Sequence, residues 1–208
     1  MMWKDCAGES RIYAIIAVFI LIVVIFAVMF SGRPFTPAYV GNDVLDGGWG
    51  ENLVKRADDS QLFGLERYVS LTYEIDGLYP ASLTVTTIKT PVMMNEQDLR
   101  DKTVETIEQA SELGIVVDPT TEIIGERLLN NTHKTLYIMY DGNDTSKTPA
   151  ERIKIIGETW NCGASVTSII CIGVAQITDY AHNNVTTNIE QWNKIIEEDG
   201  LIFNVICH

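Results

Sequence analysis

Four cysteines carry the most distinctive chemistry in this 208-residue chain. A hairpin that turns through residues 165–168 would set Cys162 and Cys171 directly opposite one another. Directly opposed cysteines bring their sulfurs within disulfide range. A turn at residues 163–164 breaks this register, and the alternatives are then a bridge to Cys207 or reduced, buried thiols that behave as small apolar side chains. The spacing therefore makes Cys162 and Cys171 the disulfide candidates.

Metal ligation and catalysis have no recognisable motif in this sequence. The cysteines form no Cys-x-x-Cys pair, and His133, His182 and His208 are isolated in sequence, so no zinc site is expected. Residues 141–145 do not match the twelve-residue calcium loop and are interpreted as a solvated turn. The nucleophile motifs Gly-x-Ser-x-Gly and Ser-x-x-Lys are absent, and the glycine-rich residues 47–50 lack the lysine of a phosphate-binding loop. We therefore expect no catalytic residue, no metal and no cofactor.

Three Asn-x-Ser/Thr sequons begin at Asn130, Asn143 and Asn184. Each falls in a predicted turn or loop, where a surface glycan can be accommodated. These three asparagines are the glycosylation candidates, in an organism that has the machinery.

The charge balance is strongly acidic, with 15 Lys and Arg against 28 Asp and Glu and a net charge of −13. A field of this sign repels phosphate backbones. The sequence also lacks a basic stripe with interleaved aromatic residues, so nucleic acid is excluded as a partner.

One long segment, residues 12–30, contains no charged residue, amide, proline or glycine. As a helix it would span about 28 Å, close to the roughly 30 Å of a bilayer's hydrocarbon core. Near its C-terminal end no two small residues have the Ala-x-Ala spacing of a signal-peptidase site, which favours an uncleaved transmembrane signal anchor over a signal peptide. The basic residues before it predict that residues 1–11 are cytoplasmic and that the C-terminal domain lies outside the cytoplasm, with the protein in the cell membrane. A prepilin-type leader, cut just before the apolar run, is the alternative.

Beyond the apolar segment, residues 31–62 carry prolines and several glycines without a sustained apolar period, which predicts a stalk. Residues 63–208 show the patterns of a folded extracytoplasmic domain. Helical spacing of apolar residues runs from Asn95 to Gly114, and a capping box at Thr187 predicts a second helix. Alternating or β-branched runs predict strands over residues 68–75, 81–89, 121–129, 134–140, 152–160 and 166–176.

Short turns between these strands imply an antiparallel arrangement. The expected fold class is α+β, an antiparallel β-sheet covered by two amphipathic helices and preceded by one transmembrane helix.

The order of elements over roughly residues 66–205 resembles that of the PsbP-like and DcrB-like α/β-sandwich domains. The resemblance is carried by the pattern of residues 80–107, 122–142, 152–176 and 188–200. Domains of this kind are often extracytoplasmic, membrane-tethered and non-enzymatic, and the resemblance implies an accessory or assembly module of a larger complex. The class shares no catalytic residues, so the resemblance implies no site.

We therefore expect a single-pass acidic membrane protein that displays a non-enzymatic accessory, assembly or ligand-binding subunit of a membrane complex. Its expected partners are the membrane and other membrane or cell-surface proteins. The rival hypotheses are a pilin-like structural subunit that assembles through the apolar helix, and a membrane-tethered enzyme without a recognisable motif.

Overall fold

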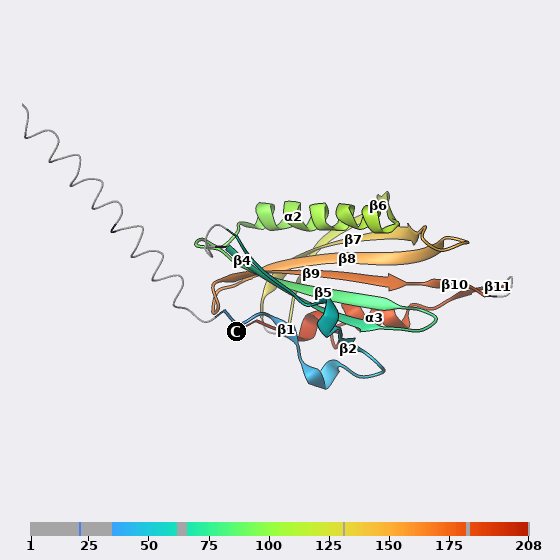
Figure 1. Cartoon of the computed structure of the whole chain (residues 1–208), viewed down its shortest axis with the longest axis horizontal. Helices are drawn as coiled ribbons and strands as arrows, with labels where there is room; N and C mark the ends of the chain where they lie inside the picture. The colour runs from blue at the N-terminus through green and yellow to red at the C-terminus, as the bar shows by residue number, and fades with distance from the viewer. Residues whose placement is uncertain (1–20, 22–34, 62–65, 131, 182–183, 208) are drawn as a thin grey trace, which may run out of the picture.

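A curved antiparallel sheet is the frame of the computed structural model, which describes residues 21, 35–61, 66–130, 132–181 and 184–207 (Figure 1). Its spatial order is β2-β4-β5-β9-β8-β7-β6, and β3 also pairs with β4. The strands are β2 (Gly50–Glu51), β3 (Ala57–Gln61), β4 (Glu66–Ile75), β5 (Ala81–Lys89), β6 (Ile115–Leu128), β7 (Lys134–Asp144), β8 (Glu151–Cys162) and β9 (Thr167–Gln176).

Three hairpins of this sheet follow from local sequence patterns. The pairs β4–β5, β6–β7 and β8–β9 join strands that are consecutive in the chain, and all three confirm predicted hairpins. In β5 every second residue is buried over most of the strand, as expected for a strand with one covered face. The central strand β9 is buried at nearly every position because both faces of the sheet are covered there.

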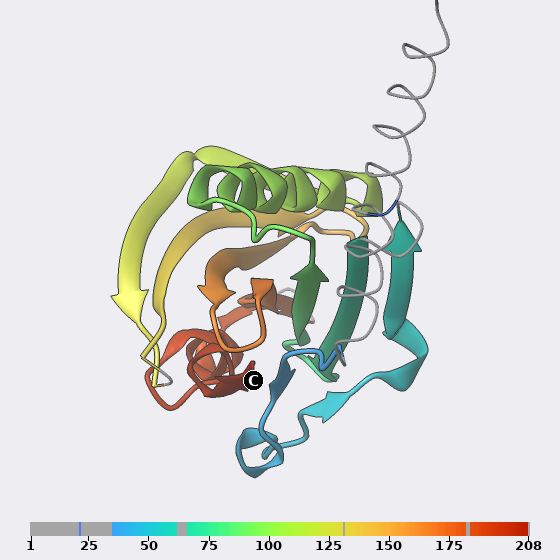
Figure 2. The same cartoon turned by 90° about the vertical axis from the view of Figure 1, so that its left-hand side faces the viewer.

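One face of the sheet is covered by α2 (Glu96–Gln109), which lies across β8 and β9 on the outside of the curve (Figure 2). The side chain of Asn95 accepts a hydrogen bond of 2.9 Å from the Asp98 N–H and so caps the helix. After the short helix η4 (Ala110–Leu113), Gly114 ends the segment with a φ of 89°, a conformation that favours glycine. The predicted helix from Asn95 to Gly114 is therefore confirmed.

The inner face of the curve is covered by segments from both ends of the described chain (Figure 2). These are α3 (Glu190–Ile196), the short helix η5 (Ile202–Asn204), and the pair of β1 (Tyr39–Val40) with β12 (Val205–Ile206). A separate hairpin, β10 (Thr178–Ala181) and β11 (Asn184–Thr187), leads into α3. Within α3, Trp192 and Ile195 are buried against the sheet, whereas Ile189, which precedes the helix, is exposed.

The predicted capping box of the second helix is wrong. Thr187 is the last residue of β11, and the residue that precedes the helix is Ile189, which makes no side-chain cap. Instead the Asn188 side chain accepts a hydrogen bond of 2.7 Å from the Glu190 N–H. Pairing of Thr187 with Thr178 in the hairpin removes the threonine from the helix terminus.

The predicted stalk over residues 31–62 differs from the structure from residue 35 onward. Residues 35–61 contribute β1, η1 (Asn42–Val44), β2, η2 (Leu53–Lys55) and β3, and the buried Ala38, Val40 and Trp49 belong to the main core. The N–H of Ala38 donates to the Thr87 hydroxyl, and the N–H of Val40 donates to the Tyr73 hydroxyl, at 2.7 and 3.0 Å. These hydrogen bonds join residues 35–61 to strands β4 and β5, which lie far away in the sequence. A local sequence pattern therefore does not predict them.

The predicted fold class is also wrong. Strands predominate among the described residues, and α3, with seven residues, is too short to cover a face of the sheet by itself. The inner face is closed by irregular segments and two-residue strands as much as by a helix. A sheet covered by two amphipathic helices is therefore not what the chain forms.

No helix in the described part of the chain is long and apolar enough to cross a membrane. The longest is α2, whose 14 residues would reach only about 21 Å and include many charged side chains. This finding corrects the predictions of a transmembrane helix, a signal anchor and a single-pass location in the cell membrane with an extracytoplasmic domain. Apart from Leu21, residues 12–30 lie outside the described residues, as do residues 1–11.

Candidate functional site

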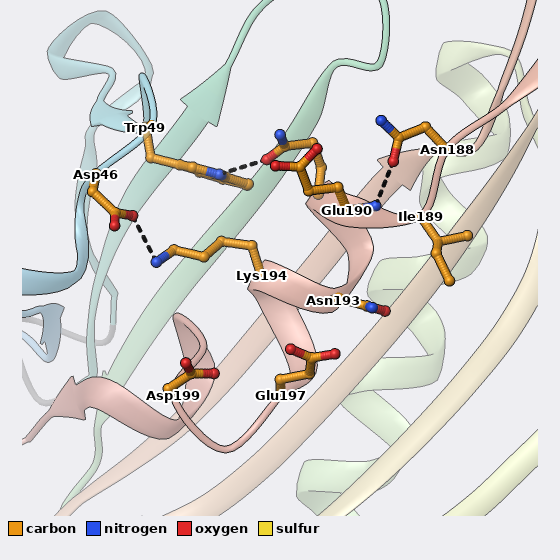
Figure 3. A pocket seen from close by; sticks show the side chains of 11 residues that line it. Asp46, Trp49, Asn188, Ile189, Glu190, Asn193, Lys194, Glu197 and Asp199 are labelled. Atoms are coloured by element: carbon orange, nitrogen blue, oxygen red, sulfur yellow. Dashed lines mark hydrogen bonds and ion pairs between the residues drawn. The ribbon is translucent and has the colours of Figure 1, made fainter.

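The candidate site is a cleft of about 590 Å³ between the N-terminal segment and α3 (Figure 3). One wall is the turn before β2, and the other is the exposed side of α3 with the loop that follows it. Its lining is mostly polar and consists of Asp46, Gly47, Trp49, Asn188, Ile189, Glu190, Gln191, Asn193, Lys194, Glu197 and Asp199.

The N-terminal wall depends on a tight turn at Gly47 and Gly48. Their φ angles are 64° and 99°, in the left-handed region that glycine adopts without a steric penalty. The turn sets Asp46 at the mouth of the cleft and directs the Trp49 ring inward. Trp49 is only 5% exposed, and its indole N–H donates a 2.9 Å hydrogen bond to the Gln191 side chain. This bond joins the two walls.

The helical wall depends on the spacing within α3 and on a close approach after it. Glu190 and Lys194 are four residues apart and therefore share one side of the helix. The chain then turns so tightly that a Cβ at Gly200 would lie 2.6 Å from the Lys194 carbonyl oxygen. Glycine at this position lets the loop with Glu197 and Asp199 fold back beside the helix.

The cleft carries an excess of negative charge. Lys194 forms an ion pair of 2.6 Å with Asp46, and the hydrogen bond and charge of this ammonium lower the pKa of the Asp46 carboxyl. Glu190, Glu197 and Asp199 are exposed and form no ion pair within the described residues. The one ammonium of the lining is thus already paired, and three carboxylates are left to attract a cation.

The predicted disulfide between Cys162 and Cys171 is not compatible with the strand register. The hairpin turns at residues 163–166, which pairs Cys162 with Thr167 and Cys171 with Glu158. Cys162, Cys171 and Cys207 are all buried free thiols. The turn contains residues 163–164, the alternative in the sequence analysis, but extends to residue 166, so Cys162 pairs with Thr167 and not with Ser165.

The fold brings His133 beside Cys207, a pair that is far apart in sequence. His133 Nε2 lies 3.2 Å from the Cys207 sulfur. Burial raises the pKa of the Cys207 thiol to about 12 and lowers the pKa of His133. Both shifts favour the neutral forms, which is the reverse of what a thiolate nucleophile with an imidazolium partner requires.

The sequons are not all in loops. Asn130 follows β6 and is exposed, and its side-chain amide donates a 3.1 Å hydrogen bond to the Glu198 carbonyl oxygen. Asn143 lies within β7 with an exposed side chain, and Asn184 begins β11. Exposure of Asn130 and Asn143 is compatible with glycosylation, which remains a prediction.

Sequence reasoning missed the cleft. Gly47, Gly48 and Trp49 lie within the predicted stalk, although tryptophan is on average highly buried in folded proteins. Asp46 and Lys194 gave no local signal, because their pairing depends on how the two ends of the chain meet.

Comparison with protein-family models, with curated proteins and with solved structures finds no match to this chain.

Proposed function

We propose that this chain is a non-enzymatic binding domain, an accessory or assembly subunit whose cleft holds a basic segment of a partner protein. The observation that carries the proposal is a set of three carboxylates that line one cleft and form no ion pair within the described residues, namely Glu190, Glu197 and Asp199. A lysine or arginine side chain would supply the missing positive charge and hydrogen-bond donors.

Two further properties support this function. The net charge of −13 attracts cationic partners at long range and speeds their association. The Trp49–Gln191 hydrogen bond also holds the two walls together before any ligand arrives, which reduces the entropic cost of binding.

The test uses a fluorescently labelled peptide of alternating arginine and glycine, titrated with the protein at physiological ionic strength. The double variant Glu197→Gln/Asp199→Asn should bind roughly threefold to tenfold more weakly, since each exposed ion pair contributes up to about 1 kcal/mol. Lys194→Met should bind more tightly, because it removes the competing ammonium and frees Asp46.

Matched controls lie on the opposite face of the sheet. Glu108→Gln/Glu112→Gln makes the same change in net charge on α2 and η4, and Lys102→Met matches Lys194→Met. These variants should leave the affinity of the peptide nearly unchanged. Equal losses in the two double variants would show that the net charge alone attracts the peptide and would refute the cleft as the site.

A further inference from the structure

Three metal-ligating side chains from distant parts of the chain meet near the C-terminal end of the described residues. His133 directly precedes β7, Cys162 ends β8, and Cys207 follows β12. Their donor atoms all lie within 4.8 Å of one another, and the His133 Nε2 to Cys207 Sγ distance is 3.2 Å. The cluster is separate from the cleft, since none of its residues lines that cleft.

The spacing of the donors is close to that of a tetrahedral metal site. Zinc binds thiolate sulfur at about 2.3 Å and imidazole nitrogen at about 2.0–2.1 Å, which places neighbouring ligand atoms roughly 3.3–3.8 Å apart. The cluster therefore needs only small side-chain movements to surround an ion. Two thiols and an imidazole are also a donor set that favours zinc over magnesium or calcium.

A second observation points to a ligand at the same place. The indole N–H of Trp160 is buried, with 3% of the residue exposed, and has no hydrogen-bond partner among the described residues. Its contact with the Cys207 sulfur lowers the pKa of that thiol, against the larger effect of burial, but does not reach the geometry of a hydrogen bond. A metal-bound thiolate is a much better hydrogen-bond acceptor than a thiol, so metal binding would give this buried donor a partner.

The backbone holds each ligand in place. The His133 carbonyl oxygen accepts a 3.0 Å hydrogen bond from the Leu129 N–H, and Cys162 is fixed by its pairing with Thr167. The Ser165 hydroxyl donates to the Cys207 carbonyl oxygen at 3.1 Å. Ligands on such supported segments are already arranged for binding.

We propose that His133, Cys162 and Cys207 form a zinc site that fastens the C-terminal segment to the β8–β9 hairpin. A water molecule or another donor completes the tetrahedron. Because β12 pairs with β1, the ion also steadies the N-terminal segment that continues into the wall of the cleft. Zinc binding should therefore raise the thermal stability of the whole chain.

Cobalt titration of the reduced, metal-free full-length chain tests the site. One equivalent of Co²⁺ should produce thiolate-to-cobalt charge-transfer absorption and the intense visible bands of tetrahedral coordination, and one equivalent of Zn²⁺ should remove them. Cys207→Ser should abolish the charge-transfer band or weaken binding at least tenfold, and His133→Ala should weaken binding and change the visible bands. Circular dichroism checks that both variants are folded.

Cys171→Ala is the matched control, because Cys171 is equally buried but lies outside the cluster. This variant should bind cobalt as the unmodified chain does. The proposal is overturned if the unmodified chain gives no charge-transfer band, or if Cys207→Ser and His133→Ala bind as tightly as Cys171→Ala. Mass spectrometry showing that Cys162 and Cys207 form a disulfide even under reducing conditions would replace the metal site with a covalent bridge.

Discussion

Arg127 and Glu158 form the most deeply buried ion pair among the described residues. The Glu158 side chain is fully buried, and the Arg127 Nε donates to its Oε1 at 2.9 Å. The guanidinium also donates to the Ile196 carbonyl oxygen at 2.6 Å and lies 4.4 Å from the Phe203 ring centroid. This one side chain therefore links the edge strand β6 to β8, to the end of α3 and to η5.

Replacing Arg127 by Met should destabilise the fold by about 3–5 kcal/mol, because Glu158 would remain buried without its partner. Chemical denaturation followed by circular dichroism measures the change. Lys134→Met is the control, since it removes an exposed ion pair with Glu126 and should cost at most about 1 kcal/mol. Adding Glu158→Gln to Arg127→Met should recover part of the loss. If Arg127→Met were no less stable than Lys134→Met, the pair would have no structural importance.

The pKa of Asp46 reports on the ion pair at the cleft. The hydrogen bond and charge of Lys194 lower this pKa below its ordinary value of 3.8, so NMR titration should find a lower value that returns toward 3.8 in Lys194→Met. The pair stabilises the folded chain above pH 3.8, and this contribution disappears as the pH falls through the lowered pKa. Lys147→Met, which removes a partner of Glu151, should leave the Asp46 titration unchanged. An Asp46 pKa that is identical in all three proteins would rule out the ion pair in solution.

At the scale of elements, two glycines allow a helix to approach each face of the sheet. A Cβ at Gly157 would collide with Thr103 of α2, and a Cβ at Gly173 would lie 2.7 Å from the Ile195 Cγ2 of α3. In both cases the added Cβ would lie closer to the helix than a normal van der Waals contact allows. The helices α2 and α3 can therefore pack this closely against the sheet only because glycine has no side chain. The sequence pattern of β8 and β9 does not reveal this, because the helix residues that each Cβ would meet lie elsewhere in the chain.

Substitution of either glycine by alanine should destabilise the protein by about 1–3 kcal/mol through overpacking. Gly163→Ala is the control, since a Cβ there would meet nothing within 4 Å and the change should stay within about 0.5 kcal/mol. Thermal melts of the three variants give the comparison. Indistinguishable melting temperatures would mean that the helices do not dock as closely as these distances require.

At the scale of the whole molecule, the segment over residues 35–61 completes the core. Val40 and Trp49 are buried in the main core, and Tyr73 on β4, which bonds to Val40, is only 2% exposed. A chain that begins at Phe35 should unfold cooperatively. A chain that begins at Glu66 should lose that cooperativity, because the inner face of the sheet would be open to water.

Urea denaturation monitored by tryptophan fluorescence and circular dichroism distinguishes the two chains. A cooperative transition of similar midpoint for the shorter chain would restore the interpretation of residues 35–61 as a stalk. Loss of the transition in the shorter chain, with a sharp transition in the longer one, is the expected result.

The sequence by itself determined the three hairpins, the capped helix α2 and the acidic character of the chain. Each of these depends on residues that are close in sequence, such as the alternation in β5, the Asn95 cap and the left-handed Gly114. Alternation and turn chemistry act over a few residues, so they can be recognised without the rest of the molecule.

Only the tertiary structure decided the cleft, the thiol and imidazole cluster, and the place of residues 35–61. The Trp49–Gln191 hydrogen bond joins residues 142 positions apart, and His133 lies 74 positions from Cys207. The register of β8 and β9 also separated Cys162 from Cys171 and left Cys162 next to Cys207 instead. Such contacts depend on how the sheet curves and on which segments close its inner face, and no local pattern encodes these features because they are set by the packing of the whole core.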